Sequence, residues 1–88
     1  MNVKIDYGIY RVRCFCMDIA GSVDGADRMV SDLKWYINTG RASTEFLRVF
    51  CHLKGNQYKK IAVLLSAGGS TEETVARVKA YIDSKREG

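Results

Sequence analysis

Hydrophobic and polar residues alternate along three segments of the chain, and a period of two is typical of β-strands. The first segment covers residues 9–18, with residues 3–7 as an extension or a separate edge piece. The second and third cover residues 44–54 and 58–66, and the Gly55-Asn56 pair between them is typical of a hairpin turn. The pattern therefore predicts one strand and, later in the chain, two strands joined as a β-hairpin.

Two other segments repeat their apolar residues every three or four positions, which is the spacing of one face of an α-helix. Ser22 is a suitable N-cap for a helix that runs to about residue 38, and Thr39-Gly40 supplies its C-terminal stop. Its expected core stripe is Ala26, Val30, Leu33 and Ile37. Ser70 and Glu73 form a capping box before a second helix, whose expected core residues are Val75, Val78 and Ile82.

The order strand, helix, strand, strand, helix predicts an α+β fold of two layers, in which both helices pack on one face of a three-stranded sheet. With 88 residues, the chain is expected to form a single domain that spans 1–88. Strand parity, with a hairpin loop of odd length, decides which side chains the helices cover. The residues expected on this covered face are Tyr10, Val12, Cys14, Cys16, Leu47, Val49, Cys51, Leu53, Ile61, Val63 and Leu65.

The opposite face of the sheet should stay open, because two short helices can cover only one face. Aromatic and basic side chains interleave on it, and an exposed patch of this kind usually marks a binding site. The predicted binding residues on this face are Arg11, Arg13, Phe15, Phe46, Arg48, Phe50, Tyr58 and Lys60. Trp35, on the polar side of the first helix, either anchors an interface or packs on the N-terminal segment or the loop after Gly40.

Three interpretations of the open face compete. Residues 1–8 could fold over it, a protein could dock on it, or single-stranded RNA or DNA could stack its bases on Phe15 and Phe50. The leading hypothesis is a non-enzymatic protein-interaction module, acting as a homodimer, an adaptor or an inhibitor of a larger complex. Nucleic-acid binding is the alternative, and it should weaken steeply with salt, whereas an aromatic protein interface should persist.

Composition narrows these classes only a little. The chain is 47% hydrophobic and 27% charged, which is the balance of an ordinary globular domain. It has no apolar run long enough for a membrane span, its first residues are too polar for a signal peptide, and its three cysteines are expected to be reduced thiols. We therefore expect a cytoplasmic protein with no membrane partner. The net charge of +4 is a mild basic bias, weaker than that of most dedicated nucleic-acid binders.

Candidate catalytic and metal-binding groups do not form a convincing set. Cys14, Cys16 and Cys51 could gather on one face of the sheet, but His52 would point to the opposite face, which argues against a zinc site. The Gly-rich turn at residues 67–69 lacks the lysine of a phosphate-binding loop. No nucleophile and base meet the geometric requirements of a catalytic pair, so no enzyme activity, cofactor or metal is predicted.

The segment Leu64-Leu65-Ser66-Ala67-Gly68-Gly69-Ser70-Thr71-Glu72-Glu73 resembles the passage from last strand to last helix in the small DinI-like proteins. The resemblance implies a βαββα topology. It implies no functional residues, because the last helix of that family is acidic, whereas this one carries Arg77, Lys79, Lys85 and Arg86.

Overall fold

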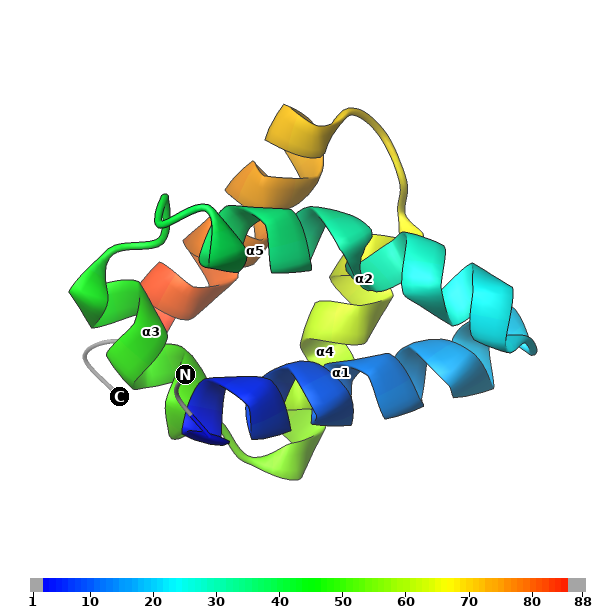
Figure 1. The fold of residues 1–88 in the computed structure, drawn as a ribbon, viewed down its shortest axis with the longest axis horizontal. Helices are drawn as coiled ribbons and strands as arrows, with labels where there is room; N and C mark the ends of the chain where they lie inside the picture. Colours follow the sequence, from blue (N-terminus) through cyan, green and yellow to red (C-terminus); the bar gives the residue numbers. More distant parts are fainter. Residues whose placement is uncertain (1–2, 86–88) are drawn as a thin grey trace.

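The computed structural model describes residues 3–85, which form five α-helices and no strand (Figure 1). The helices are α1 (Val3–Ala20), α2 (Val23–Asn38), α3 (Thr44–Cys51), α4 (Gly55–Ser66) and α5 (Thr71–Ser84). Helices α1 and α2 form an antiparallel pair, and α1 also packs against α3 and α4. Helix α5 closes the other side by packing on α2, α3 and α4.

The predicted α+β fold is wrong, because the three expected strands are helices α1, α3 and α4. Helix α4 shows the reason. Its buried residues are Tyr58, Ile61, Ala62 and Leu65, which follow the helical spacing of three and four. Val63, which alternation placed in the core, is 44% exposed. Gly55 and Asn56 begin this helix and do not form a hairpin turn.

The resemblance to the DinI-like proteins fails for the same reason, since its βαββα topology needs a sheet. The segment that suggested it runs from the end of α4, through a glycine turn, into α5. Residues 3–8 likewise do not fold over a sheet, because they form the first turns of α1. Residues 1 and 2 of that proposed covering segment lie outside the described residues.

The two predicted helices are confirmed. The Ser22 hydroxyl accepts a hydrogen bond from the Gly25 N–H at 3.0 Å, and the expected stripe of α2 is buried. At the end of α2, Gly40 has a φ of 75°, which a residue with a side chain rarely adopts. Ser70 and Glu73 form the predicted capping box of α5. These signals are local, so they hold whatever the rest of the chain does.

A column of aromatic rings joins α2, α3 and α4 in the core. The rings of Tyr36, Phe46, Phe50 and Tyr58 follow one another at centroid distances of 5.2, 6.2 and 5.5 Å. The Tyr58 hydroxyl donates a hydrogen bond to the carbonyl oxygen of Phe50 at 2.6 Å, which satisfies a buried polar group. Phe46, Phe50 and Tyr58 were predicted to face solvent from a sheet. That prediction is wrong, since all three are buried.

Candidate functional site

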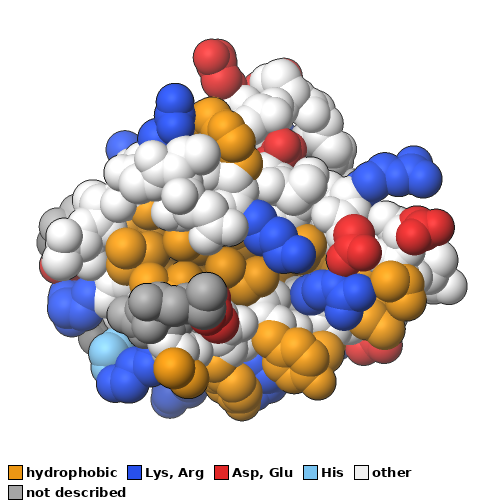
Figure 2. Space-filling view, in the orientation of Figure 1, with side chains coloured by type: hydrophobic (Ala, Val, Ile, Leu, Met, Phe, Trp, Pro, Cys, Tyr) orange, Lys and Arg blue, Asp and Glu red, His pale blue; other side chains and the backbone are white. Residues whose placement is uncertain are grey.

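Helix α1 carries apolar side chains on two opposite faces. Its inner face packs Ile9, Val12 and Cys16 into the core. At about 100° per residue, the opposite face presents Val3, Tyr7, Tyr10 and Cys14, which we call the outer stripe. Val3, Tyr7 and Tyr10 are 80%, 54% and 57% exposed, and Cys14 is half-buried. Figure 2 shows hydrophobic and basic side chains interleaved along the lower edge of the molecule, where α1 runs.

Contacts along its length hold α1 in place, so the outer stripe is presented on a fixed helix. Near its start, Gly8 lets the helix approach the ring of Phe50 closely. Toward its end, Nε of Arg13 donates to Oδ1 of Asp27 on α2 at 2.7 Å. The hydrogen bond from Arg13 lowers the pKa of Asp27, because it stabilises the ionised carboxylate.

Arg11 orders one edge of the outer stripe. Its Nη1 donates to the Tyr7 hydroxyl at 3.0 Å. Its guanidinium carbon lies 5.8 Å from the centroid of the Tyr7 ring and 5.7 Å from that of Phe15. A cation that contacts one aromatic ring a helical turn before it and another a turn after it restricts the rotamers of all three side chains. The aromatic surface on this edge is therefore already organised before any partner binds.

Tyr10 and Cys14 interact on the outer stripe itself. Hydrogen bonding between the two side chains raises the pKa of the Tyr10 hydroxyl above its ordinary value. At neutral pH the Tyr10 hydroxyl is therefore protonated and uncharged. The centre of the outer stripe consequently carries no charge, which lowers the cost of removing it from water.

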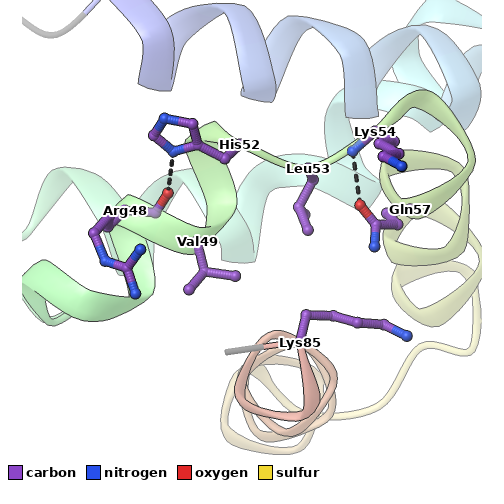
Figure 3. Close-up of a pocket in the computed structure, with 7 residues that line it drawn as sticks. All are labelled: Arg48, Val49, His52, Leu53, Lys54, Gln57 and Lys85. Carbon is purple, nitrogen blue, oxygen red and sulfur yellow. Dashed lines mark hydrogen bonds between the residues drawn. The ribbon is translucent and has the colours of Figure 1, made fainter. Parts of the chain in front are cut away.

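A second surface is a basic cleft of about 410 Å³ between α3, the start of α4 and the end of α5 (Figure 3). Its lining residues are Arg48, Val49, His52, Leu53, Lys54, Gln57 and Lys85. All ionisable side chains named on its wall are basic. Arg48, however, is paired with Glu45, and the Lys85 ammonium lies 5.2 Å from the centroid of the Tyr81 ring. The cleft can attract an anion, but two of its cations already have partners.

Hydrogen bonds fix two corners of the basic cleft. His52 Nδ1 is 2.7 Å from the carbonyl oxygen of Arg48, so this nitrogen carries the proton and donates it. The side-chain oxygen of Gln57 accepts from the backbone N–H of Lys54 at 2.7 Å (Figure 3). This second bond stabilises the first turn of α4, where backbone N–H groups have no partner within the helix.

The predicted binding residues do not gather on one face. Arg11, Arg13 and Phe15 lie on α1, each partly buried, and Lys60 is exposed on α4. Arg48 is exposed at the basic cleft. Phe46, Phe50 and Tyr58 lie in the core and leave the candidate surface.

Trp35 is 43% exposed on α2, as expected for its polar face. The guanidinium of Arg41 lies 4.5 Å above its ring, so the loop after Gly40 covers part of the indole. Trp35 therefore packs on the loop after Gly40, which is one of the contacts that the sequence suggested for it. The remaining exposed part borders a shallow hollow that Val75 and Lys79 of α5 also line.

Sequence reasoning missed Val3, Tyr7 and Tyr10. Alternation assigned Tyr10 to the covered face of a sheet, and the N-terminal segment was considered only as a covering piece. The signal that could have identified them is their spacing of four and then three, continued by Cys14, which repeats helically. The same segment also carries the inner stripe of Ile9, Val12 and Cys16. The sequence alone could therefore not show which of the two apolar faces is buried and which is exposed.

Within residues 3–85, no three His, Cys, Asp or Glu side chains lie close enough together to hold a metal ion. Burial raises the pKa of the Cys16 thiol to about 11, which leaves it protonated and a poor nucleophile at neutral pH. No helix in the described part of the chain has the length and apolar character needed to cross a bilayer.

Comparisons with protein-family models, with curated proteins and with solved structures find no match to this chain. The surfaces of the chain itself are therefore the basis for assigning a function, and on them the outer stripe of α1 exposes Val3, Tyr7 and Tyr10.

Proposed function

We propose that this chain is a non-enzymatic protein-interaction module, in which the outer stripe of α1 packs against a helix of another polypeptide chain. The observation that supports this proposal is the exposure of Val3, Tyr7 and Tyr10 on a face that the domain's own core does not use. A helix that is apolar on both faces is normally buried on both.

The composition of the outer stripe suits an interface. Tyrosine and arginine are enriched among the residues that dominate binding energy, and each tyrosine supplies a large apolar area with a polar tip. Because Arg11 already orders Tyr7, less side-chain entropy is lost on binding. The spacing of the stripe residues along α1 is that by which helices dock on grooves or on other helices.

Site-specific photo-cross-linking tests the proposal and does not require the partner to be identified first. A benzoylphenylalanine side chain replaces Tyr10 in one protein and Lys60, exposed on α4, in a matched control. We expect a protein adduct from position 10 and none from position 60. Adding Tyr7→Lys to the position-10 protein should remove the adduct. Equal labelling at both positions, or no adduct at position 10, would contradict the proposal.

The basic cleft supports a second candidate function, binding of a single-stranded RNA or DNA. Arg48, Lys54 and Lys85 line it. When such groups contact phosphates, the logarithm of the binding constant falls linearly with the logarithm of the salt concentration, with a slope of about −0.7 per phosphate on single strands. Titration of a mixed single-stranded oligonucleotide at two salt concentrations tests this function. Binding that weakens with salt and is lost in Lys54→Ala would favour it, and salt-independent or absent binding would exclude it.

A further inference from the structure

The outer stripe continues beyond Cys14. Met17 lies at the next position of the same repeat, and it is half-buried because it packs against the edge of the core. The five residues at 3, 7, 10, 14 and 17 follow the alternating spacing of four and three that defines the a and d positions of a two-helix seam. Helix α1 therefore carries two heptads of seam, which are exposed at Val3, Tyr7 and Tyr10 and partly covered at Cys14 and Met17.

Charged residues flank this seam on both edges. Asp6 and Arg13 occupy the edge toward α2, which corresponds to the g positions. Arg11 and Asp18 occupy the edge toward α4, which corresponds to the e positions. Lys4 also lies on this second edge, one heptad before Arg11. Along the chain, the acid therefore precedes the base on the first edge and follows the bases on the second. Asp6 and Asp18 are exposed, and neither forms an ion pair with the described residues.

We infer that the partner of the outer stripe is a second copy of this chain, with the two α1 helices packed in parallel. In a parallel pair, each g residue faces the e residue of the following heptad on the partner helix. Asp6 would face Arg11 of the second copy, and Arg13 would face Asp18 of the second copy. Two-fold symmetry makes each pair occur twice. The inference rests on the proposed function of α1.

Charge favours the parallel arrangement over the antiparallel one. When the same seam layers meet in antiparallel order, each edge faces the same edge of the partner. Asp6 would then face Arg13 of the second copy, which attracts, but Arg11 would face Lys4 of the second copy, which repels. Asp18 would lie beyond the end of the paired segment, so the antiparallel seam keeps only one of its two kinds of charge pair attractive. The parallel arrangement leaves the intramolecular contacts of both arginines in place. Each guanidinium has five N–H donors, and several stay available. Arg13 uses Nε for Asp27 and Nη1 for the Met17 sulfur, and Arg11 uses Nη1 for Tyr7.

The area available indicates a reversible dimer. Fully buried tyrosines contribute about 150–250 Å² each, so the exposed parts of Tyr7, Tyr10 and Val3 supply on the order of 300–400 Å² per chain. Stable complexes usually bury about 800 Å² per partner. We therefore expect a weak dimer with a dissociation constant on the order of 10 µM.

Sedimentation velocity over a range of concentrations tests self-association. The wild-type chain should pass from monomer to dimer, and Tyr7→Ser with Tyr10→Ser should raise the dissociation constant at least tenfold. Asp18→Lys should raise it severalfold, because it turns two attractive pairs into repulsive ones. Lysine near the end of α1 also suits the helix dipole, so loss of the dimer in this variant cannot arise from a weakened helix. Lys60→Ser serves as the control that changes nothing.

Oxidation of Cys14 by copper phenanthroline tests the orientation. A disulfide needs Cα atoms within about 7 Å, and the parallel seam places Cys14 opposite its own copy. In the antiparallel seam, Cys14 would face Val3 and lie about 16 Å from its copy. In a Cys51→Ser background, we expect a covalent dimer that Cys14→Ser abolishes. A dimer in solution that resists this cross-link would overturn the parallel arrangement.

The outcomes separate this inference from the proposed function. If the chain is a monomer at all concentrations while position 10 cross-links to a different protein, the second copy is excluded and the interaction module remains. If position 10 cross-links to nothing, both fail. An adduct of twice the mass of the chain, together with concentration-dependent dimerisation, supports both.

Discussion

Gly8 lies directly against the ring of Phe50, at the point where α1 crosses α3. A Cβ atom added at Gly8 would come within 2.6 Å of Cε2 of that ring and 3.2 Å of the Tyr58 hydroxyl oxygen. A glycine inside a helix costs stability relative to alanine, so its presence at this position has a packing reason. It sets the distance between the helix that carries the outer stripe and the aromatic column beneath it.

Gly8→Ala is expected to destabilise the domain by about 1–2 kcal/mol, despite a gain of about 1 kcal/mol in helix propensity. Phe50 is fully buried and cannot move aside. Urea unfolding measures the change, with Lys60→Ala on exposed α4 surface as the control. Combining Gly8→Ala with Phe50→Leu should recover part of the loss, because the smaller side chain makes room. A Gly8→Ala protein as stable as wild type would show that α1 does not approach the ring this closely.

Phe50→Glu and Val63→Asp should have opposite outcomes. Phe50 is fully buried, so the substitution removes a large apolar side chain and buries a carboxylate, and we expect the domain to unfold. Val63 is 44% exposed on α4, so Val63→Asp should remain folded, with a loss of no more than about 1 kcal/mol. Far-UV circular dichroism distinguishes the two. A three-stranded sheet would require the reverse result.

Cys16 should make stability fall at alkaline pH. Its pKa is raised to about 11 in the folded protein, whereas an unfolded cysteine titrates near 8.5. Between these values the unfolded chain has lost the proton that the folded chain keeps, so the free energy of unfolding decreases as pH rises. The effect should begin above about pH 8.5 and amount to about 3 kcal/mol by pH 11.

The variant Cys16→Ala isolates this effect. It removes the thiol and should flatten the decrease in stability between pH 8.5 and 10, measured by urea unfolding at each pH, with Cys14→Ala as the control on the solvent side of the same helix. Burial also raises the pKa of the Cys51 thiol and of Tyr58, so a smaller slope of the same sign should remain. An unchanged slope in Cys16→Ala would contradict the burial of this thiol.

The pKa of Asp27 reports whether α1 and α2 are joined as the structure shows. Arg13 lowers the pKa of Asp27 through the 2.7 Å hydrogen bond. The ionised pair therefore stabilises the fold fully above the pKa that this carboxyl has in the unfolded chain, and the stabilisation is lost as the pH falls through its pKa in the folded protein. NMR titration of the carboxyl carbon should show a value below the usual range in the wild type. In Arg13→Ala the value should rise toward that range. A value that does not respond to this substitution would mean that the pair is not formed in solution.

Helices α2 and α5 could be predicted from the sequence because their signals are local. Ser22 and Ser70 accept hydrogen bonds from backbone N–H groups within their own first turns. A glycine with positive φ ends α2 in a conformation that few other residues adopt. Such features are formed by residues close together in the sequence, so they can be recognised without knowing how the rest of the chain packs.

Helices α1, α3 and α4 could not be predicted in the same way, because their apolar residues fit both the two-residue period of a strand and the 3.6-residue period of a helix. Ile61 and Leu65 are buried under either interpretation of α4, and β-branched and aromatic residues favour strands by propensity. The deciding residues are Ala62, which is buried, and Val63, which is exposed. Propensity is a weak guide that tertiary contacts override, and here the contacts of α4 with α1 and α5 selected the helix.

The same distinction between local signals and tertiary contacts applies to the candidate surface. By themselves, the residues determined the caps and turns of α2 and α5, a mild basic charge, and an excess of aromatic and basic side chains beyond what one small core needs. Only the tertiary structure decided that Phe50 belongs to the core and Tyr10 to the surface. The physical reason is that α1 carries two apolar faces, and the packing of α2, α3 and α4 against Ile9 and Val12 leaves the other face to solvent.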